Sequence, residues 1–221
     1  MSKIEIVKEG ITDLHTAAVV NAANEFLHEG GGVCGVIFKA AGAGRLQQAC
    51  DEIGGCPTGS AVITRAFDLD ADYIIHAVGP VWHGGSHGEP DFLYGAYYRS
   101  LELAAEHGCK SIGFPLISTG IFGYPVDKGW EVALKACQEF LTARPDVNIL
   151  IRFGVPGEEN RRIGQEVYKK IFGEEDDTVI TIISIPASTL KKLEQLAGQS
   201  GATQSELIAD MIERYAADLK S

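Results

Sequence analysis

Strand-like and helix-like segments alternate along most of this chain, and this alternation is the strongest constraint on its fold. Six short runs are rich in β-branched and aromatic residues, as is typical of strands. They are residues 4–7, 17–22, 60–66, 72–78, 111–117 and 148–153. Longer runs repeat apolar residues every three or four positions, which predicts helices over 33–42, 93–108, 128–143 and 159–172. The alternation predicts an α/β fold in which helices cover a central sheet.

Several classes of protein are disfavoured by the bulk properties. No segment approaches the roughly 20 apolar residues of a membrane span, and the charged N-terminus lacks the apolar run of a signal peptide. The five cysteines are odd in number and form no CxxC pair, which indicates reduced thiols. We therefore expect a cytoplasmic protein. The formal net charge of −11 disfavours general nucleic-acid binding, so local backbone amides and helix ends must hold any anionic ligand.

Two loops that contain glycine follow predicted strands. The first glycine loop is EGGGVCG (residues 29–35), and the second glycine loop is STGIFGYP (residues 118–125). In α/β sheets, ligands bind in loops beyond the carboxyl ends of the strands. Glycine lets backbone N–H groups approach a phosphate closely. Either loop alone is also compatible with a simple tight turn, but the pair predicts a diphosphate site.

The order and spacing of several motifs resemble those of a known family. The motifs are VVNAAN with GGGV, CPTGSAVIT, IHAVGP and FPLISTGIFGYP. Over residues 1–173 the chain resembles the macrodomains, which implies a three-layer α/β/α sandwich with a central mixed sheet. The resemblance also implies binding of ADP-ribose or an ADP-ribosylated protein, with no cofactor and no metal. In many members it implies hydrolysis of ADP-ribosyl esters, either modified Asp and Glu side chains or O-acetyl-ADP-ribose.

The same resemblance implies roles for individual residues. Asn24 is the expected catalytic residue, which orients the distal ribose and the attacking water, whereas Asn21 is assigned a structural role in the turn. Phe153 is expected to face the adenine ring. The other residues expected to contact ADP-ribose are Ile11, Gly30, Gly31, Gly32, Val33, Cys34, Ser118, Thr119, Gly120, Ile121 and Phe122.

Two positions depart from the family pattern. Many macrodomains carry an Asp that binds the adenine amino group, and Gly10 stands in its place here, with Glu9 or Asp13 as alternatives. A hydrolase subgroup has an Asp near the scissile bond where this chain has Cys34. Viral macrodomains also lack that Asp, so we expect hydrolysis by a positioned water. A reader that binds ADP-ribose without turnover is the alternative, and a nucleophilic Cys34 is disfavoured.

The histidines do not indicate a metal site. His83 and His87 are four residues apart, but the glycines between them argue against a helix, and no third ligand is evident. This segment is predicted to be a mobile loop. His76 lies in a strand-like run and is predicted to be a core histidine.

After Gly173 the composition changes. Residues 174–178 are predicted to be an acidic linker, and residues 179–221 resemble ribbon-helix-helix domains of bacterial repressors and antitoxins. This small β-α-α segment buries too little surface alone, so it should dimerise or dock on its neighbour, and a homodimer is the expectation that we prefer. DNA binding is disfavoured because the expected base-reading positions Ile180, Ile182 and Ser184 carry no basic or amide side chain. A DNA-tethered regulator is the alternative function for this segment.

Overall fold

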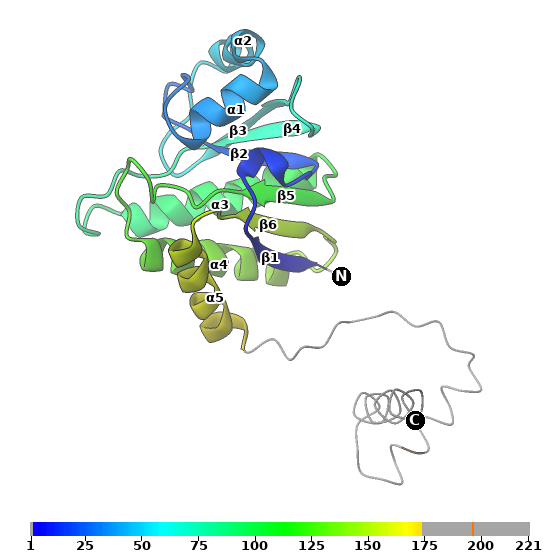
Figure 1. Ribbon diagram of the computed structural model, residues 1–221, viewed down its shortest axis with the longest axis vertical. Coiled ribbons are helices and arrows are strands. Elements are labelled where there is room, and N and C mark those ends of the chain that lie inside the picture. Colours follow the sequence, from blue (N-terminus) through cyan, green and yellow to red (C-terminus); the bar gives the residue numbers. More distant parts are fainter. Residues whose placement is uncertain (1, 174–195, 197–221) are drawn as a thin grey trace. The chain divides into compact units, whose positions relative to one another are not determined.

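The computed structural model describes residues 2–173 and Leu196. Within this part of the chain, six strands form one sheet in the order β1-β6-β5-β2-β4-β3, with helices on both faces (Figure 1). The predicted linker, the ribbon-helix-helix-like segment and its dimer lie outside the described residues, apart from Leu196.

The strands lie in the six predicted regions, and their ends differ from the predicted ones by at most three residues. They are β1 (Lys3–Val7), β2 (Ala18–Ala22), β3 (Ala61–Arg65), β4 (Tyr73–Ala77), β5 (Ser111–Phe114) and β6 (Leu150–Gly154). Only β3 runs antiparallel to its neighbour, β4, and the other pairs are parallel. The predicted mixed sheet is therefore confirmed. Because the parallel strands end at one edge, their following loops lie close together.

The helices form two layers on opposite faces of the sheet. They are α1 (Val33–Ala41), α2 (Ala43–Ile53), α3 (Glu89–Glu106), α4 (Val126–Ala143) and α5 (Glu158–Phe172), with a short 3-10 helix η1 (Ile11–Asp13). Helices α1 and α2 share one hydrophobic core with Val19 and Ile74 of the sheet. Helices α3, α4 and α5 share the other core with Val20 and Ile75. Adjacent strand residues thus face opposite layers, which confirms the predicted three-layer α/β/α sandwich.

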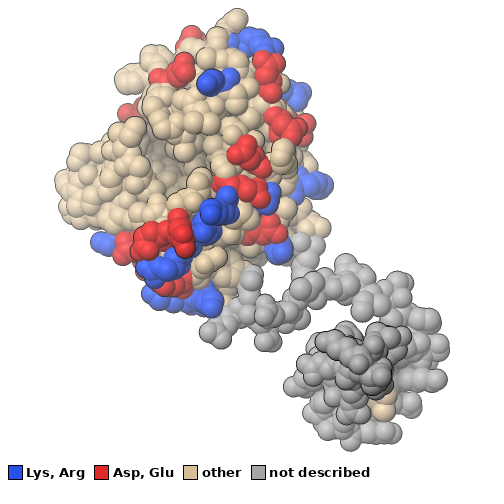
Figure 2. Space-filling model, viewed as in Figure 1, with Lys and Arg blue, Asp and Glu red and all other residues tan. Residues whose placement is uncertain are grey.

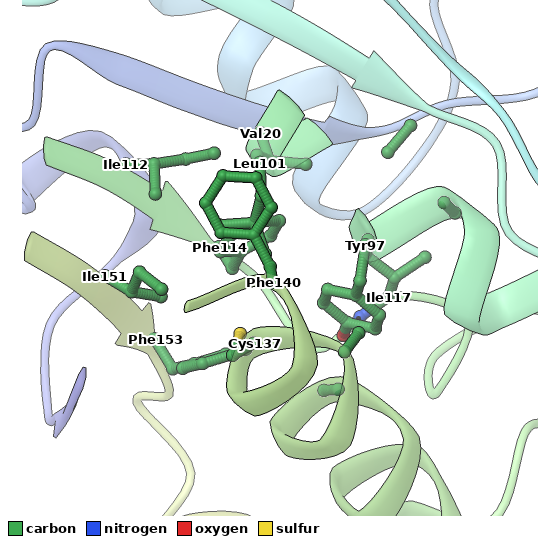
Figure 3. Packing of buried hydrophobic residues seen from close by; sticks show 14 of the residues in the cluster. Val20, Tyr97, Leu101, Ile112, Phe114, Ile117, Cys137, Phe140, Ile151 and Phe153 are labelled. Atoms are coloured by element: carbon green, nitrogen blue, oxygen red, sulfur yellow. Dashed lines mark hydrogen bonds between the residues drawn. The ribbon is translucent and has the colours of Figure 1, made fainter. Parts of the chain in front are cut away.

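The core on the α3–α5 side is rich in aromatic rings (Figure 3). Phe153 of β6 has 0% of its surface exposed, and its ring stacks on Phe114 with centroids 5.5 Å apart. The ring of Trp130 also packs against Phe153, with ring centroids 5.1 Å apart. The prediction that Phe153 faces adenine is therefore wrong. In a parallel strand that is buried on both faces, sequence does not distinguish a core ring from one at a ligand site.

The described residues also bear on the predictions made from the cysteines and from the apolar segments of the sequence. All five cysteines lie in this part of the chain, and each is buried and free of disulfides. None of the helices in the described part is long and apolar enough to cross a membrane.

Candidate functional site

A cavity of about 320 Å³ opens where β2, β4 and β5 end. Both glycine loops border it, together with Gly79 after β4. The molecule is hollowed on this side, and the residues flanking the hollow are mostly uncharged (Figure 2). A larger hollow of about 630 Å³ lies along β1 and α5. That hollow runs beside an edge strand and has no glycine loop, so we assign the site to the smaller cavity at the strand ends.

Most of the predicted ligand residues do meet at this cavity. Those that line it are Asn24, Gly30, Gly31, Gly32, Val33, Cys34, Ser118, Gly120, Ile121 and Phe122. Ile11, Thr119 and Phe153 do not line it. The side chain of Ile11 is buried in the core beneath α1 and α2. The Thr119 hydroxyl donates to the carbonyl of Leu116 at 2.9 Å, so it points into its own loop.

Sequence reasoning missed part of the lining. The additional residues are Ala22, Ala23, Gly79, Pro115, Leu116 and Ile117. Gly79 had a signal in the IHAVGP motif, and the structure explains why it is glycine. A Cβ at this position would lie 2.3 Å from Ser118 Oγ and 2.6 Å from Ile117 Cγ2. Gly79 therefore allows the second glycine loop to approach the end of β4.

The first glycine loop leads directly into the N-terminus of α1. Gly32 precedes the helix with φ 62° and ψ −135°, a conformation that favours glycine. A Cβ on Gly35 would lie 2.7 Å from the carbonyl oxygen of Gly30, so the loop folds tightly onto the first turn. The first N–H groups of a helix lack intrahelical partners and carry partial positive charge. The loop therefore presents backbone donors to the cavity, as an anionic ligand requires.

The second glycine loop faces the first across the cavity. Ser118 adopts φ 65°, a left-handed conformation that costs a residue other than glycine about 1–3 kcal/mol. The loop is held by hydrogen bonds from Tyr124 N to Ser118 O and from Gly123 N to Gly120 O, both 3.0 Å. The Ser118 hydroxyl is buried and has no partner among the described residues. Ser118 lines the cavity, and a buried hydroxyl normally has a hydrogen-bond partner, so a polar ligand is a candidate partner for it.

Asn24 lines the cavity, and its carboxamide also organises the turn that follows β2. Its Oδ1 accepts hydrogen bonds from the backbone N–H groups of Phe26 and His28, both at 3.2 Å. Its Nδ2 donates to the carbonyl oxygen of His28 at 2.8 Å. A carboxamide nitrogen carries two hydrogens, so one remains for a ligand, whereas both acceptor sites of Oδ1 are used. Asn24 can therefore orient a ligand oxygen only by donating to it.

Cys34 lines the cavity and belongs to a buried polar cluster. Its Sγ is 3.6 Å from Asn21 Nδ2, which also contacts His76 Nδ1 at 3.2 Å. Burial raises the pKa of the Cys34 thiol, and this outweighs its hydrogen bonds with Gly30 and Asn21. A thiol with a raised pKa is a poor nucleophile at neutral pH, which agrees with a structural role for Cys34. The structural role predicted for Asn21 fits its position between β4 and α1.

His76 is the core histidine that the sequence predicts. It has 0% of its surface exposed and lies 3.0 Å from Thr64 Oγ1 through Nε2. Within the described residues, no cluster of His, Cys, Asp and Glu is arranged to hold a metal ion.

The buried histidine predicts that folding stability falls in mild acid. Burial lowers the pKa of His76 from 6.5 to about 4, so the unfolded chain binds a proton between these values and the folded chain does not. Stability is therefore highest above pH 6.5 and falls as pH decreases toward 4. We expect the free energy of unfolding to be about 2 kcal/mol lower at pH 5 than at pH 7.5, measured by urea denaturation.

The matched controls are His76→Gln and His83→Gln, because His83 is exposed. The His76 variant should lose most of this pH dependence, and the His83 variant should keep it. If the free energy of unfolding depended on pH equally in the wild type and in His76→Gln, His76 would not be the cause of the pH dependence.

Comparison with known proteins shows to which family this chain is similar. Residues 20–133 match the family model of the Macro domain. A macro domain-containing protein of Chlorobaculum tepidum is 52% identical over 138 residues, covering 62% of this chain and 80% of that protein. A protein of Escherichia fergusonii named O-acetyl-ADP-ribose deacetylase is 43% identical over 180 residues, covering 80% of this chain and 98% of that protein.

The fold agrees with this similarity. The structure of the Oceanobacillus iheyensis macrodomain with ADP superimposes with a TM-score of 0.72 at 37% identity. The match covers 76% of this chain and 91% of that one. The family model, the relatives and the three-layer fold agree, and this chain belongs to the macrodomain family.

Proposed function

We propose that this protein binds ADP-ribose and hydrolyses ADP-ribosyl esters, on Asp or Glu side chains or as O-acetyl-ADP-ribose. The observation that carries the proposal is that both glycine loops and Asn24 border one cavity at the strand ends. The backbone donors of the loops suit a diphosphate, and Asn24 suits the adjoining ribose. The ADP in the Oceanobacillus structure and the name of the Escherichia relative support this ligand class.

The proposed reaction needs a positioned water more than a strong base. Asn24 donates its free N–H to an oxygen of the distal ribose or of the water, which directs the water toward the anomeric carbon. The water oxygen bonds to that carbon, and the bond to the ester oxygen breaks. The carboxylate leaves with the electron pair, and the proton of the water passes to solvent. Loop amides hold the diphosphate in place during these steps.

A reader function is the second candidate, and Cys34 is the observation that favours it. Its neutral thiol replaces the carboxylate expected in one hydrolase subgroup, and among the described residues that line the cavity none is an Asp, Glu or His. The deciding experiment measures ADP-ribose affinity by calorimetry and ADP-ribose release from a protein modified on glutamate. Binding with release supports the hydrolase, and binding without release supports the reader. Absence of binding would contradict both.

A pair of glycine substitutions tests whether the first glycine loop holds the ligand. In Gly35→Ala, the new Cβ would meet the Gly30 carbonyl at 2.7 Å and displace the loop. We expect the dissociation constant for ADP-ribose to rise roughly 10- to 100-fold, because small misplacements of binding groups are costly. Gly44→Ala is the matched control, since a Cβ there meets nothing within 4 Å. Equal affinities of the two variants, measured by calorimetry, would exclude this loop from the site.

The remaining predictions concern the cellular compartment of the protein, its oligomeric state and its binding of DNA. The five free cysteines support a reducing compartment, and we keep the cytoplasm as its proposed identity. A homodimer formed through residues 179–221 stays a prediction, as does the disfavoured binding of DNA. Sedimentation of the full chain beside residues 1–173 tests the dimer, because equal oligomeric states would exclude the C-terminal segment as its cause.

A further inference from the structure

Glu89 is a buried acid that lies outside the cavity. Only 2% of its surface is exposed, and it is the one buried charged side chain among the described residues. Glu89 is the first residue of α3 and follows residues 82–88, which we call the tryptophan loop. Burying a carboxylate is costly unless it is well hydrogen-bonded, so this residue requires an explanation.

The carboxylate of Glu89 binds the backbone of the tryptophan loop. Its Oε1 accepts from the N–H groups of His83 at 2.9 Å and Gly85 at 3.1 Å, and its Oε2 accepts from His87 N at 2.6 Å. Three amides of this loop, which the sequence predicts to be mobile, thus converge on one buried side chain. The role of Glu89 was not predicted from the sequence, where His83 and His87 were considered as metal ligands and Glu89 was not considered.

Glu89 stays ionised under all ordinary conditions. Burial alone would raise its pKa, but the hydrogen bonds from its own N–H and from His83, His87 and Gly85 hold the pKa at about 2. Hydrogen bonds to a charged acceptor are stronger than those to a neutral one. The anchor is thus present across the physiological range of pH.

The tryptophan loop is in turn joined to the second glycine loop. The N–H of Trp82 donates to the carbonyl oxygen of Phe122 at 2.8 Å. The indole of Trp82 contacts the ring of Tyr124 edge-on, with centroids 4.6 Å apart. On its other side the loop folds back on this indole, because a Cβ on Gly85 would lie 2.7 Å from Trp82 Cη2. Trp82 therefore connects the Glu89 anchor with two residues of the second glycine loop.

This connection reaches the cavity. Phe122 lines it, and Ile121 extends across it until its Cδ1 lies 3.6 Å from a Cβ built on Gly31. The second glycine loop also contains the left-handed Ser118, a conformation that persists only where the surroundings enforce it. No residue of the tryptophan loop lines the cavity, so any effect of Glu89 on a ligand is indirect, and Trp82 supplies the contacts with the second glycine loop.

We propose that Glu89 is a positioning residue for ADP-ribose binding: its carboxylate fixes the tryptophan loop, and Trp82 thereby holds the second glycine loop in its ligand-binding conformation. The inference rests on the proposed function, because it concerns affinity for the ligand proposed there. It adds a residue that determines affinity for ADP-ribose without contacting the ligand or the reacting atoms.

Two variants of Glu89 and one control test the proposal. Glu89→Ala removes all three acceptor contacts. Glu89→Gln keeps an oxygen for His83 and Gly85 but places an amide N–H₂ against the N–H of His87, so it should give a partial effect. Asp91→Asn is the control, since it removes one charge from the same helical turn at an exposed position.

The first measurement is hydrogen–deuterium exchange of the full chain without ligand. We expect Glu89→Ala to accelerate exchange in residues 82–88 and also in residues 118–124, with Glu89→Gln intermediate and Asp91→Asn unchanged. Acceleration confined to residues 82–88 would overturn the proposal, because it would show a local anchor without influence on the cavity. This readout does not depend on any ligand, so it stands even if the protein fails to bind ADP-ribose.

The second measurement is the dissociation constant for ADP-ribose by calorimetry. Substitutions within a coupling network commonly change affinity by roughly 2- to 30-fold, and we expect an increase in that range for Glu89→Ala and a smaller one for Glu89→Gln. In turnover the change should appear in KM, since Asn24 belongs to the other wall of the cavity. Wild-type affinity in both variants would overturn the proposal. Absence of binding by the wild type itself would instead reject the proposed function.

Discussion

Replacing Asn24 with Ala is expected to lower the rate of ADP-ribosyl ester hydrolysis by about 10²- to 10³-fold, the usual cost of removing one preorganised hydrogen-bond donor. The variant loses the one side-chain N–H of Asn24 that has no partner among the described residues. It also loses three hydrogen bonds that hold the turn, two from Phe26 N and His28 N and one to His28 O. The measurement is ADP-ribose release from a protein modified on glutamate.

A second substitution separates the donor from the turn. Asn24→Asp keeps an oxygen for the N–H groups of Phe26 and His28 but cannot donate, so we expect it to lose turnover as well. Asn148→Ala is the matched control, because Asn148 is exposed just before β6. Retention of wild-type turnover by Asn24→Asp would show that the donated hydrogen bond is not needed, and the mechanism would have to be abandoned.

Replacing Phe153 with Ala is expected to lower the free energy of unfolding by about 3–5 kcal/mol, as is typical when a buried aromatic ring is deleted. The ring is fully buried in contact with Phe114 and Trp130, so the deletion leaves a cavity in the core. Denaturation by guanidinium measures this loss. Phe67→Ala is the control, since Phe67 is 39% exposed, and its loss should be about 1 kcal/mol or less.

The same position decides between a core role and an adenine-binding role. Phe153→Leu keeps most of the apolar volume and should cost about 1.5 kcal/mol or less, so the variant stays folded. Because Phe153 does not line the cavity, its affinity for ADP-ribose should equal that of the wild type. A weakened affinity in a folded Phe153→Leu protein would restore the adenine-binding role.

Helix α2 is not among the helices predicted from the sequence. It follows α1 directly at Gly42, which has φ 87°, and Leu46 and Cys50 are its two buried residues. Leu46, Cys50 and Ile53 do recur every three or four positions, so the apolar periodicity of this segment was a usable signal for a helix. The strands were predicted more completely, because runs of β-branched residues buried on both faces are distinctive even without neighbours.

For the site, the sequence by itself determined which backbone segments form the cavity. Glycines that permit close approach, at strand ends that must meet at one edge of a parallel sheet, are local features with a predictable position. Ten of the thirteen predicted ligand residues, Asn24 and Cys34 included, line the cavity for that reason.

Only the tertiary structure decided the roles of the side chains. Phe153 lies in the core, the hydroxyl of Thr119 binds its own loop, and the acceptor atom of Asn24 is already occupied. Glu89 reads as an ordinary acid at the start of a helix, yet it anchors a loop beside the cavity. The direction of a side chain and its partners depend on contacts between residues distant in sequence, and no local pattern specifies those contacts.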